Sequence, residues 1–255
     1  MLQIKPTKHL IGIMIQGDYN DLYDLVDSIY GMCGFDECPE SPYYGAKDLL
    51  LGLCYETRHA YRASREILSV ENGMNKDIMK WKEITAPSEN VYFSTNIFFP
   101  EAIFLAIVLP ETYDFSKKYY GRHSKYKGSV YEPRSLMRFY RDRANLEVLC
   151  SAIWQALGEV IGEREAEKLL EKREELEPKH YISYIIEYIK RCNMELIRTE
   201  EKDRRQKLRD ITERILGRPE SYDDLEKKLA FWAEKYGKNI HQIHAKADYP
   251  EEIDW

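Results

Sequence analysis

Apolar and polar residues alternate along the chain in two places, and each place predicts a β-strand. Near the N-terminus Ile11, Ile13 and Ile15 occupy every second position, and β-branched residues favour the pleated surface of a sheet. Residues 91–98 repeat this alternation with larger side chains. The pattern therefore predicts strands near residues 11–16 and 91–98.

A continuous apolar run, residues 102–109, lies between Pro100 and Pro110. Because two prolines this close together bound a segment that is short for a helix, we interpret the run as a buried strand that pairs with 91–98. The alternative is a short buried helix with Pro100 at its first position, where the missing amide costs nothing. With the strand interpretation the sheet has about three strands, which is enough if helices cover it.

Helical spacing of apolar residues dominates the rest of the chain. Leu22, Leu25 and Ile29 predict a helix over 19–30 that Asp18 can cap. Residues 69–89 predict irregular or briefly helical structure. Further stripes predict helices over residues 46–68, 133–161, 163–177, 182–196, 208–215 and 221–236.

These elements predict an α+β fold that is predominantly helical, with a small sheet covered by helices and a C-terminal helical region. We expect residues 1–115 to form the α+β portion. Residues 116–255 form the helical portion, packed on the first as one unit. The tail, residues 238–255, has no pattern that predicts an element.

Composition supports a folded, cytoplasmic protein. Of 255 residues 44% are hydrophobic and 32% charged, with a net charge of −6, so the chain can bury a core and is not disordered. The run 102–109 is far shorter than the roughly 20 residues that a membrane-spanning helix needs, and the N-terminus has no signal-peptide pattern. Five scattered cysteines, an odd number, indicate free thiols in a reducing compartment.

The length of the segment 180–216 predicts self-association. As one helix it would extend about 55 Å, whereas a 255-residue globule is about 46 Å across. The helix therefore either breaks in the charged stretch 199–207 or projects from the body with apolar residues at its far end. From the projecting form we predict a homo-oligomer, a dimer through the C-terminal helices that charge substitutions at Ile211 and Ile215 weaken.

The most unusual charged pattern is formed by Glu56, His59 and Arg62, which are three positions apart and share one face of a helix. Glu56 could hold the imidazole of His59, and Arg62 could bind an anionic group presented to it, so these are the candidate catalytic residues. The alternative, which we favour, is a solvated ladder of ion pairs along a helix surface.

Metal sites have weak support, and we predict no metal and no cofactor. A single Glu-x-x-His is half of a di-iron signature, and no second one occurs. His241, His244 and Asp248 are more typical of surface groups near a chain end. Cys33, Cys38 and Cys54 are spaced more loosely than zinc ligands usually are.

The segment 116–143 is strongly basic, with nine Lys and Arg residues against two acidic ones and interleaved aromatic rings. Such a segment can neutralise phosphates and stack on bases, which makes part of it a candidate anion-binding site for a polyanion. The alternative, which we favour, is docking of the basic segment on acidic surface of the protein itself, or on an acidic helix such as 163–177 of a neighbouring subunit. The candidate anion-binding residues are Arg122, Lys125, Lys127, Arg134 and Arg138.

The phosphate-binding P-loop, the dinucleotide fingerprint, the zinc-protease helix and the serine-hydrolase elbow are all absent from the sequence. The stretches 12–22 (GIMIQGDYNDL) and 55–62 (YETRHAYR) resemble a family of bacterial proteins with no assigned function, over about the first 110 residues. The resemblance implies a bacterial, intracellular protein and carries over no activity.

Two functional hypotheses follow. The first is a cytoplasmic binding or scaffolding protein that self-associates. The second is an enzyme or binding module for a phosphate-bearing ligand or nucleic acid, in which Glu56, His59 and Arg62 handle the reacting group and the basic segment 117–143 holds the polyanion. Salt-sensitive retention on an oligonucleotide column separates the two.

Overall fold

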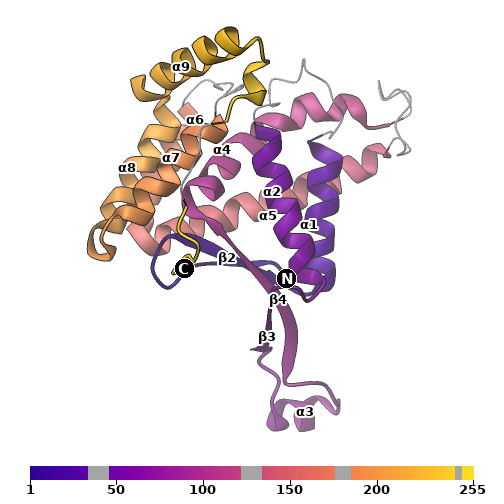
Figure 1. Cartoon of the computed structure of the whole chain (residues 1–255). Coiled ribbons are helices and arrows are strands. Elements are labelled where there is room, and N and C mark those ends of the chain that lie inside the picture. Colours follow the sequence, from indigo (N-terminus) through magenta and orange to yellow (C-terminus); the bar gives the residue numbers. More distant parts are fainter. Residues whose placement is uncertain (34–45, 122–133, 176–184, 245–248) are drawn as a thin grey trace.

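A computed structural model shows a small antiparallel sheet beneath a layer of helices (Figure 1). It describes residues 1–33, 46–121, 134–175, 185–244 and 249–255. The α+β, predominantly helical fold class is confirmed. The sheet has the strand order β1-β2-β4-β3, one strand more than expected, and consists of β1 (Gln3–Pro6), β2 (Gly12–Gly17), β3 (Glu66–Glu71) and β4 (Glu89–Phe98).

The long strand β4 pairs with different partners along its length. Its inner half, from Phe93 to Phe98, pairs with β2, whereas its outer half, from Glu89 to Ser94, pairs with β3. The β3 ladder therefore ends at the pair Glu66–Ser94, and β4 continues inward without a strand of the described residues on that side. Outward, β3 and β4 leave the body as a two-stranded arm whose tip carries α3 (Lys76–Lys82) (Figure 1).

The interpretation of residues 102–109 as a strand is wrong, and the rival helix is present. The run lies in α4 (Phe99–Ser116), which has Pro100 in its first turn and continues past Pro110. Every residue of the run is buried, and a helical segment that is apolar on every side belongs in a core. The proline spacing misled the prediction because α4 tolerates Pro110 in its interior.

The expected helix over 46–68 is too long. Helix α2 (Lys47–Tyr61) ends where Ala63 adopts a positive φ of 59°, and the amide of Ser64 donates to the carbonyl of His59 at 2.9 Å. This left-handed residue reverses the chain, as glycine commonly does at a helix end. The chain then enters β3, in which Ile67 is 55% exposed and does not belong to a buried stripe.

Other helices of the chain pack against α4. Helix α1 (Tyr19–Met32) starts with the expected Asp18 cap, whose Oδ1 accepts from the amide of Asp21 at 2.9 Å. One hydrophobic cluster includes residues from Ile4 to Leu229, and so contains both portions expected from the sequence. The other helices are α5 (Leu136–Ile161), α6 (Glu163–Glu175), α7 (Ile185–Arg198), α8 (Arg204–Gly217) and α9 (Glu220–Tyr236), with short turns η2 (Lys117–Tyr119), η3 (Glu201–Asp203) and η4 (Ile240–Gln242).

The charged stretch 199–207 breaks the long C-terminal segment. Helices α7 and α8 fold back on each other around η3, and both pack on α4. Leu208, Ile211 and Ile215 are fully buried within one copy of the chain. The reason for a dimer through these helices is therefore absent, because a single chain already covers their apolar faces.

Candidate functional site

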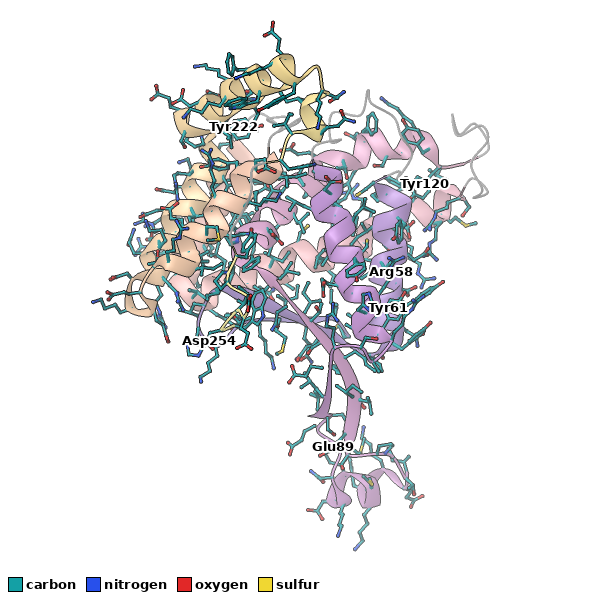
Figure 2. All side chains as sticks on the ribbon, in the orientation of Figure 1. Arg58, Tyr61, Glu89, Tyr120, Tyr222 and Asp254 are labelled. Atoms are coloured by element: carbon teal, nitrogen blue, oxygen red, sulfur yellow. The ribbon has the colours of Figure 1, made fainter. Side chains whose placement is uncertain are left out.

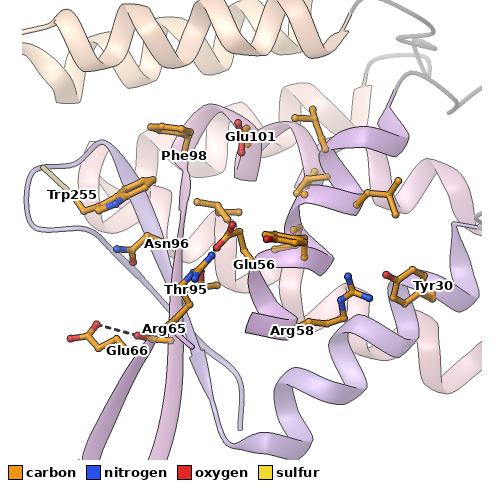
Figure 3. A pocket seen from close by; sticks show the side chains of 18 residues that line it. Tyr30, Glu56, Arg58, Arg65, Glu66, Thr95, Asn96, Phe98, Glu101 and Trp255 are labelled. Carbon is orange, nitrogen blue, oxygen red and sulfur yellow. Dashed lines mark hydrogen bonds and ion pairs between the residues drawn. The ribbon is translucent and has the colours of Figure 1, made fainter. Parts of the chain in front are cut away.

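A cavity of about 790 Å³ lies between α2 and the inner end of β4, which together we call the α2–β4 groove (Figure 3). Apolar and aromatic side chains form much of its wall, and polar groups from several elements converge on it. Such a cavity is the ordinary form of a ligand site. Its lining includes Tyr30, Leu49, Gly52, Leu53, Tyr55, Glu56, Arg58, Arg65, Glu66, Thr95, Asn96, Phe98, Glu101 and Trp255.

The inner end of β4 turns an open edge toward this groove. The amide of Phe99 donates to the carbonyl of Ile11 at 3.0 Å, and hydrogen-bonded positions alternate along an antiparallel pair. Ile97 therefore bonds to β2, while the backbone of Asn96 and the amide of Phe98 face the opposite side. The β3 ladder ends before them, so this part of the sheet has no strand partner within the described residues.

Glu101 supplies a titratable group at the inner wall of the groove. It stands in the first turn of α4, and Nδ2 of the buried Asn193 donates to its Oε1 at 2.8 Å. The same Nδ2 lies 3.1 Å from the hydroxyl of Tyr249, which fixes the orientation of the amide. Burial raises the pKa of Glu101 from 4.5 to about 7, despite the opposing effects of Asn193 and Lys190. The side chain can therefore hold or release a proton near neutral pH.

The outer rim of the groove carries charged side chains from α2 and β3. Arg65 donates from Nε to Oε2 of Glu56 at 2.9 Å, and the hydroxyl of Ser94 donates to Glu66 at 3.2 Å. Arg58 also lines the groove, and no carboxylate among the described residues pairs with it. Within the described part of the chain the rim therefore has one ion pair, Glu56 with Arg65, whereas Glu66 is held by a neutral hydroxyl and Arg58 has no ion-pair partner.

The C-terminal residue contributes an aromatic wall. The rings of Trp255 and Phe98 lie 4.9 Å apart, and the ring of Tyr249 stacks on Phe98 at 5.4 Å. Gly12 makes this possible, because a Cβ there would lie 2.7 Å from the Trp255 ring and 2.2 Å from the carbonyl of Ile97. The tail, which had no sequence pattern, is thus anchored beside the groove.

The structure does not bring the three candidate catalytic residues together. Glu56 lines the groove, but its partner is Arg65 and not His59. The ring of His59 packs against Tyr55, with centroids 4.4 Å apart. Arg62 is exposed at the end of α2, outside the groove lining.

Two candidate anion-binding arginines pair with carboxylates of the protein itself. Arg134 donates to Asp27 at 2.6 Å and to Asp142 at 3.1 Å, and Arg138 donates to Asp142 at 2.7 Å and also to Asp27. Asp142 is fully buried and also accepts from the hydroxyl of Tyr120 at 2.9 Å. The other candidates, Arg122, Lys125 and Lys127, lie outside the described residues.

Among the described residues no cluster of His, Cys, Asp and Glu has the form of a metal site. Burial raises the pKa of the Cys54 thiol to about 12, so this cysteine is an apolar core group. Of the weak metal alternatives, Cys38, Asp248 and the side chain of His241 lie outside the described part. None of the described helices combines the length and apolar character needed to cross a membrane.

Sequence reasoning missed most of the groove. The helix expected over 46–68 includes Arg65 and Glu66, but α2 ends before them, and the open edge of β4 depends on where β3 stops. One signal was available for Glu101, which is a lone carboxylate directly before the apolar run 102–109. An isolated acid in such a position is commonly a pKa-shifted group.

Comparison with known proteins gives a family and no activity. Residues 2–255 match the family described as Domain of unknown function (DUF6904). The chain belongs to this family. The resemblance to a family without assigned function is confirmed, and the match includes the C-terminal helices as well as the first 110 residues. No protein of curated function and no solved structure matches the chain.

Proposed function

We propose that this DUF6904 protein is a binding protein that takes an extended peptide segment in the α2–β4 groove. The observation that carries the proposal is the open inner edge of β4, where the amide and carbonyl of Asn96 and the amide of Phe98 face a cavity of about 790 Å³. Backbone groups in this arrangement are what a peptide strand recognises when it extends a sheet.

The dimensions of the groove suit a short strand. Residues 95–98 provide an edge of about 13 Å at 3.3 Å per residue, so a peptide of about four residues would lie along it. Its side chains would alternate between the two faces of the sheet. Glu101, at the inner wall, could accept from a donor side chain when ionised or donate when protonated.

The hypothesis of a phosphate-bearing ligand stays a prediction with less support. Arg134 and Arg138 are already paired with Asp27 and Asp142, which agrees with the alternative that the basic segment docks on the protein itself. Among the described lining residues, Arg58 is the cation without an ion-pair partner and therefore the one available to an anion. Localisation in the cytoplasm likewise stays a prediction from the cysteine pattern.

The test uses a library of random peptides presented to the purified protein. We expect binding of extended sequences, weakened at least about tenfold by N96P, because proline removes the amide that faces the groove and fills its place. Proline is tolerated where a strand amide points away from the ladder, so the fold should survive. N96A, which keeps the backbone amide, is the matched control and should bind close to the wild-type level.

Further variants examine the acidic wall. E101Q should change the pH dependence of peptide binding near pH 7. E111Q is the matched control, because Glu111 also has a pKa raised to about 7 by burial but does not line the groove. A protein that binds no peptide in the library, or an N96P variant that folds and binds like wild type, contradicts the proposal.

A further inference from the structure

The β3–β4 arm, residues 62–91 with α3 at its tip, projects into solvent (Figures 1 and 2). Most of its side chains are exposed, and these include large apolar ones. Trp81 at the tip is 79% exposed and Val91 in the arm is 60% exposed. An exposed arm buries little apolar surface of its own, and large exposed apolar side chains such as these suit a contact with a partner.

The tip is a built structure held by polar contacts. Asn75 caps α3, with its Oδ1 accepting from the amide of Ile78 at 2.9 Å. Asn72 donates from Nδ2 to the carbonyl of Pro87 and to Asn90, each at 3.0 Å, and so ties the two sides of the arm together. Trp81 is therefore presented on a preformed support, which lowers the entropy cost of docking.

A second cavity offers a matching surface on the body. It measures about 690 Å³ and lies between α4, α5 and α6. Ala106, Pro110, Trp154 and Leu170 contribute apolar lining. We call it the α5–α6 groove, and its acidic rim carries Glu159, Glu163, Glu167 and Glu174 against one cation, Arg173.

The charges of the rim and of the tip are complementary. Glu159, Glu163 and Glu167 have no ion-pair partner among the described residues, while Glu174 pairs with Arg173. The tip carries three lysines on a seven-residue helix with a single acidic residue, Asp77. The lysines are Lys76, Lys80 and Lys82, all of them exposed.

The two surfaces belong to one chain but cannot meet within one copy. Figure 1 shows α3 at the far end of the arm, below the sheet, and α6 among the helices above it. The occupant of the groove that the sequence itself provides is thus the tip of a second copy. If each arm reaches the other body, a two-fold dimer closes with two equal contacts.

Direct pairing of two β3 edges is the less favourable route to a dimer. An antiparallel pair of β3 strands aligned over their full length would place Glu66 of one copy opposite Glu71 of the other at both ends. Like charges directly opposite each other destabilise a strand pair. The lysine-bearing tip has no such conflict with the acidic rim.

We propose that two copies of this chain dock reciprocally, with Trp81 and the α3 lysines of each copy inserted in the α5–α6 groove of the other. This dimer does not depend on peptide binding in the α2–β4 groove. A buried Trp removes about 150–250 Å² from water, and the two symmetric contacts add. The α3 lysines and the glutamates of the rim lie around each docked Trp81 ring, and their opposite charges select how the two copies are oriented.

The test measures mass in solution by light scattering, with the full chain at tens of micromolar. Wild type should be a dimer. The tip variant K80E/K82E and the groove variant E163K/E167K should each be monomeric, because like charges then face each other. An equimolar mixture of the two should form a dimer, since both contacts in the mixed pair join opposite charges. K202E/K228E, a matched reversal of exposed lysines elsewhere, should stay dimeric.

Three outcomes overturn the proposal. Wild type could be monomeric at this concentration. Both reversed variants could remain dimeric, which would place the interface elsewhere. The mixture could stay monomeric although circular dichroism shows that both variants are folded, which would exclude pairing between tip and groove.

Discussion

Arg138 donates from Nε to Oδ1 of Asp142 at 2.7 Å, and the carboxylate that it meets is fully buried. The two residues are one turn apart on α5, and Arg134 approaches the other carboxylate oxygen of Asp142 at 3.1 Å. Asp27 on α1 pairs with both arginines. The basic segment thus joins α1 to α5 through a charge cluster at the edge of the core.

Replacing Asp142 by Asn should destabilise the protein by about 3 kcal/mol, because two arginines would share the single carboxylate of Asp27. Urea denaturation measures the change. E147Q is the matched control, since Glu147 forms the same i,i+4 pair with Arg143 on the same helix but is half exposed. It should cost less than about 1 kcal/mol. Equal effects of the two variants would show that the buried cluster contributes no more than a surface pair.

Gly31 leaves room for this cluster, so G31A should be destabilising. A Cβ there would lie 2.6 Å from both Oδ2 of Asp142 and the hydroxyl of Tyr120. We expect a loss of about 1–3 kcal/mol in the free energy of unfolding. G52A on α2 is the control, because nothing lies within 4 Å of its Cβ, and alanine there should stabilise the helix by about 0.5–1 kcal/mol. A neutral G31A would mean that the cluster can shift aside.

Because of Glu101, we expect the free energy of unfolding to fall as the pH rises. Its pKa is about 7 in the folded protein and 4.5 ordinarily, so the folded state binds more protons between these values. The associated stability is complete below about pH 4.5 and is lost as pH rises to about 7, by up to about 3 kcal/mol. E101Q should remove this part of the slope in denaturant midpoints measured between pH 5 and 8.

The E101Q variant should keep some pH dependence of stability, and Glu111 is its source. Burial also raises the pKa of Glu111 to about 7, so E111Q should reduce the slope in the same direction, and the double variant should be flatter than either. If the denaturant midpoint of E101Q depended on pH as strongly as that of the wild type, Glu101 would ionise below pH 5.

Amide exchange should alternate along the inner end of β4 in the free protein. The amide of Ile97 bonds to β2 and should exchange slowly, whereas the amides of Asn96 and Phe98 face the groove and should exchange faster. Residue-resolved exchange by NMR measures this. A bound peptide should slow Asn96 and Phe98 and leave Ile97 unchanged. Equal protection of all three amides without a ligand would show that the edge is already covered.

The sequence by itself determined the elements whose signal is local. Alternation around Ile13 and along 91–98 located two strands correctly, and the apolar stripe from Leu22 to Ile29 located α1 together with its Asp18 cap. The mostly helical α+β class followed from the same periodicity. Such patterns are readable because each residue contributes according to neighbours a few positions away.

Only the tertiary structure decided which distant residues meet. Arg138 and Asp27 are 111 positions apart, and no local pattern states that they pair. The apolar run 102–109 allows a buried strand or a buried helix, and the fold places it in the buried helix α4. The α2–β4 groove exists because β3 stops at Glu66, and the arm exists because β3 and β4 continue past the body. These outcomes depend on the packing of whole elements, which residue spacing does not encode.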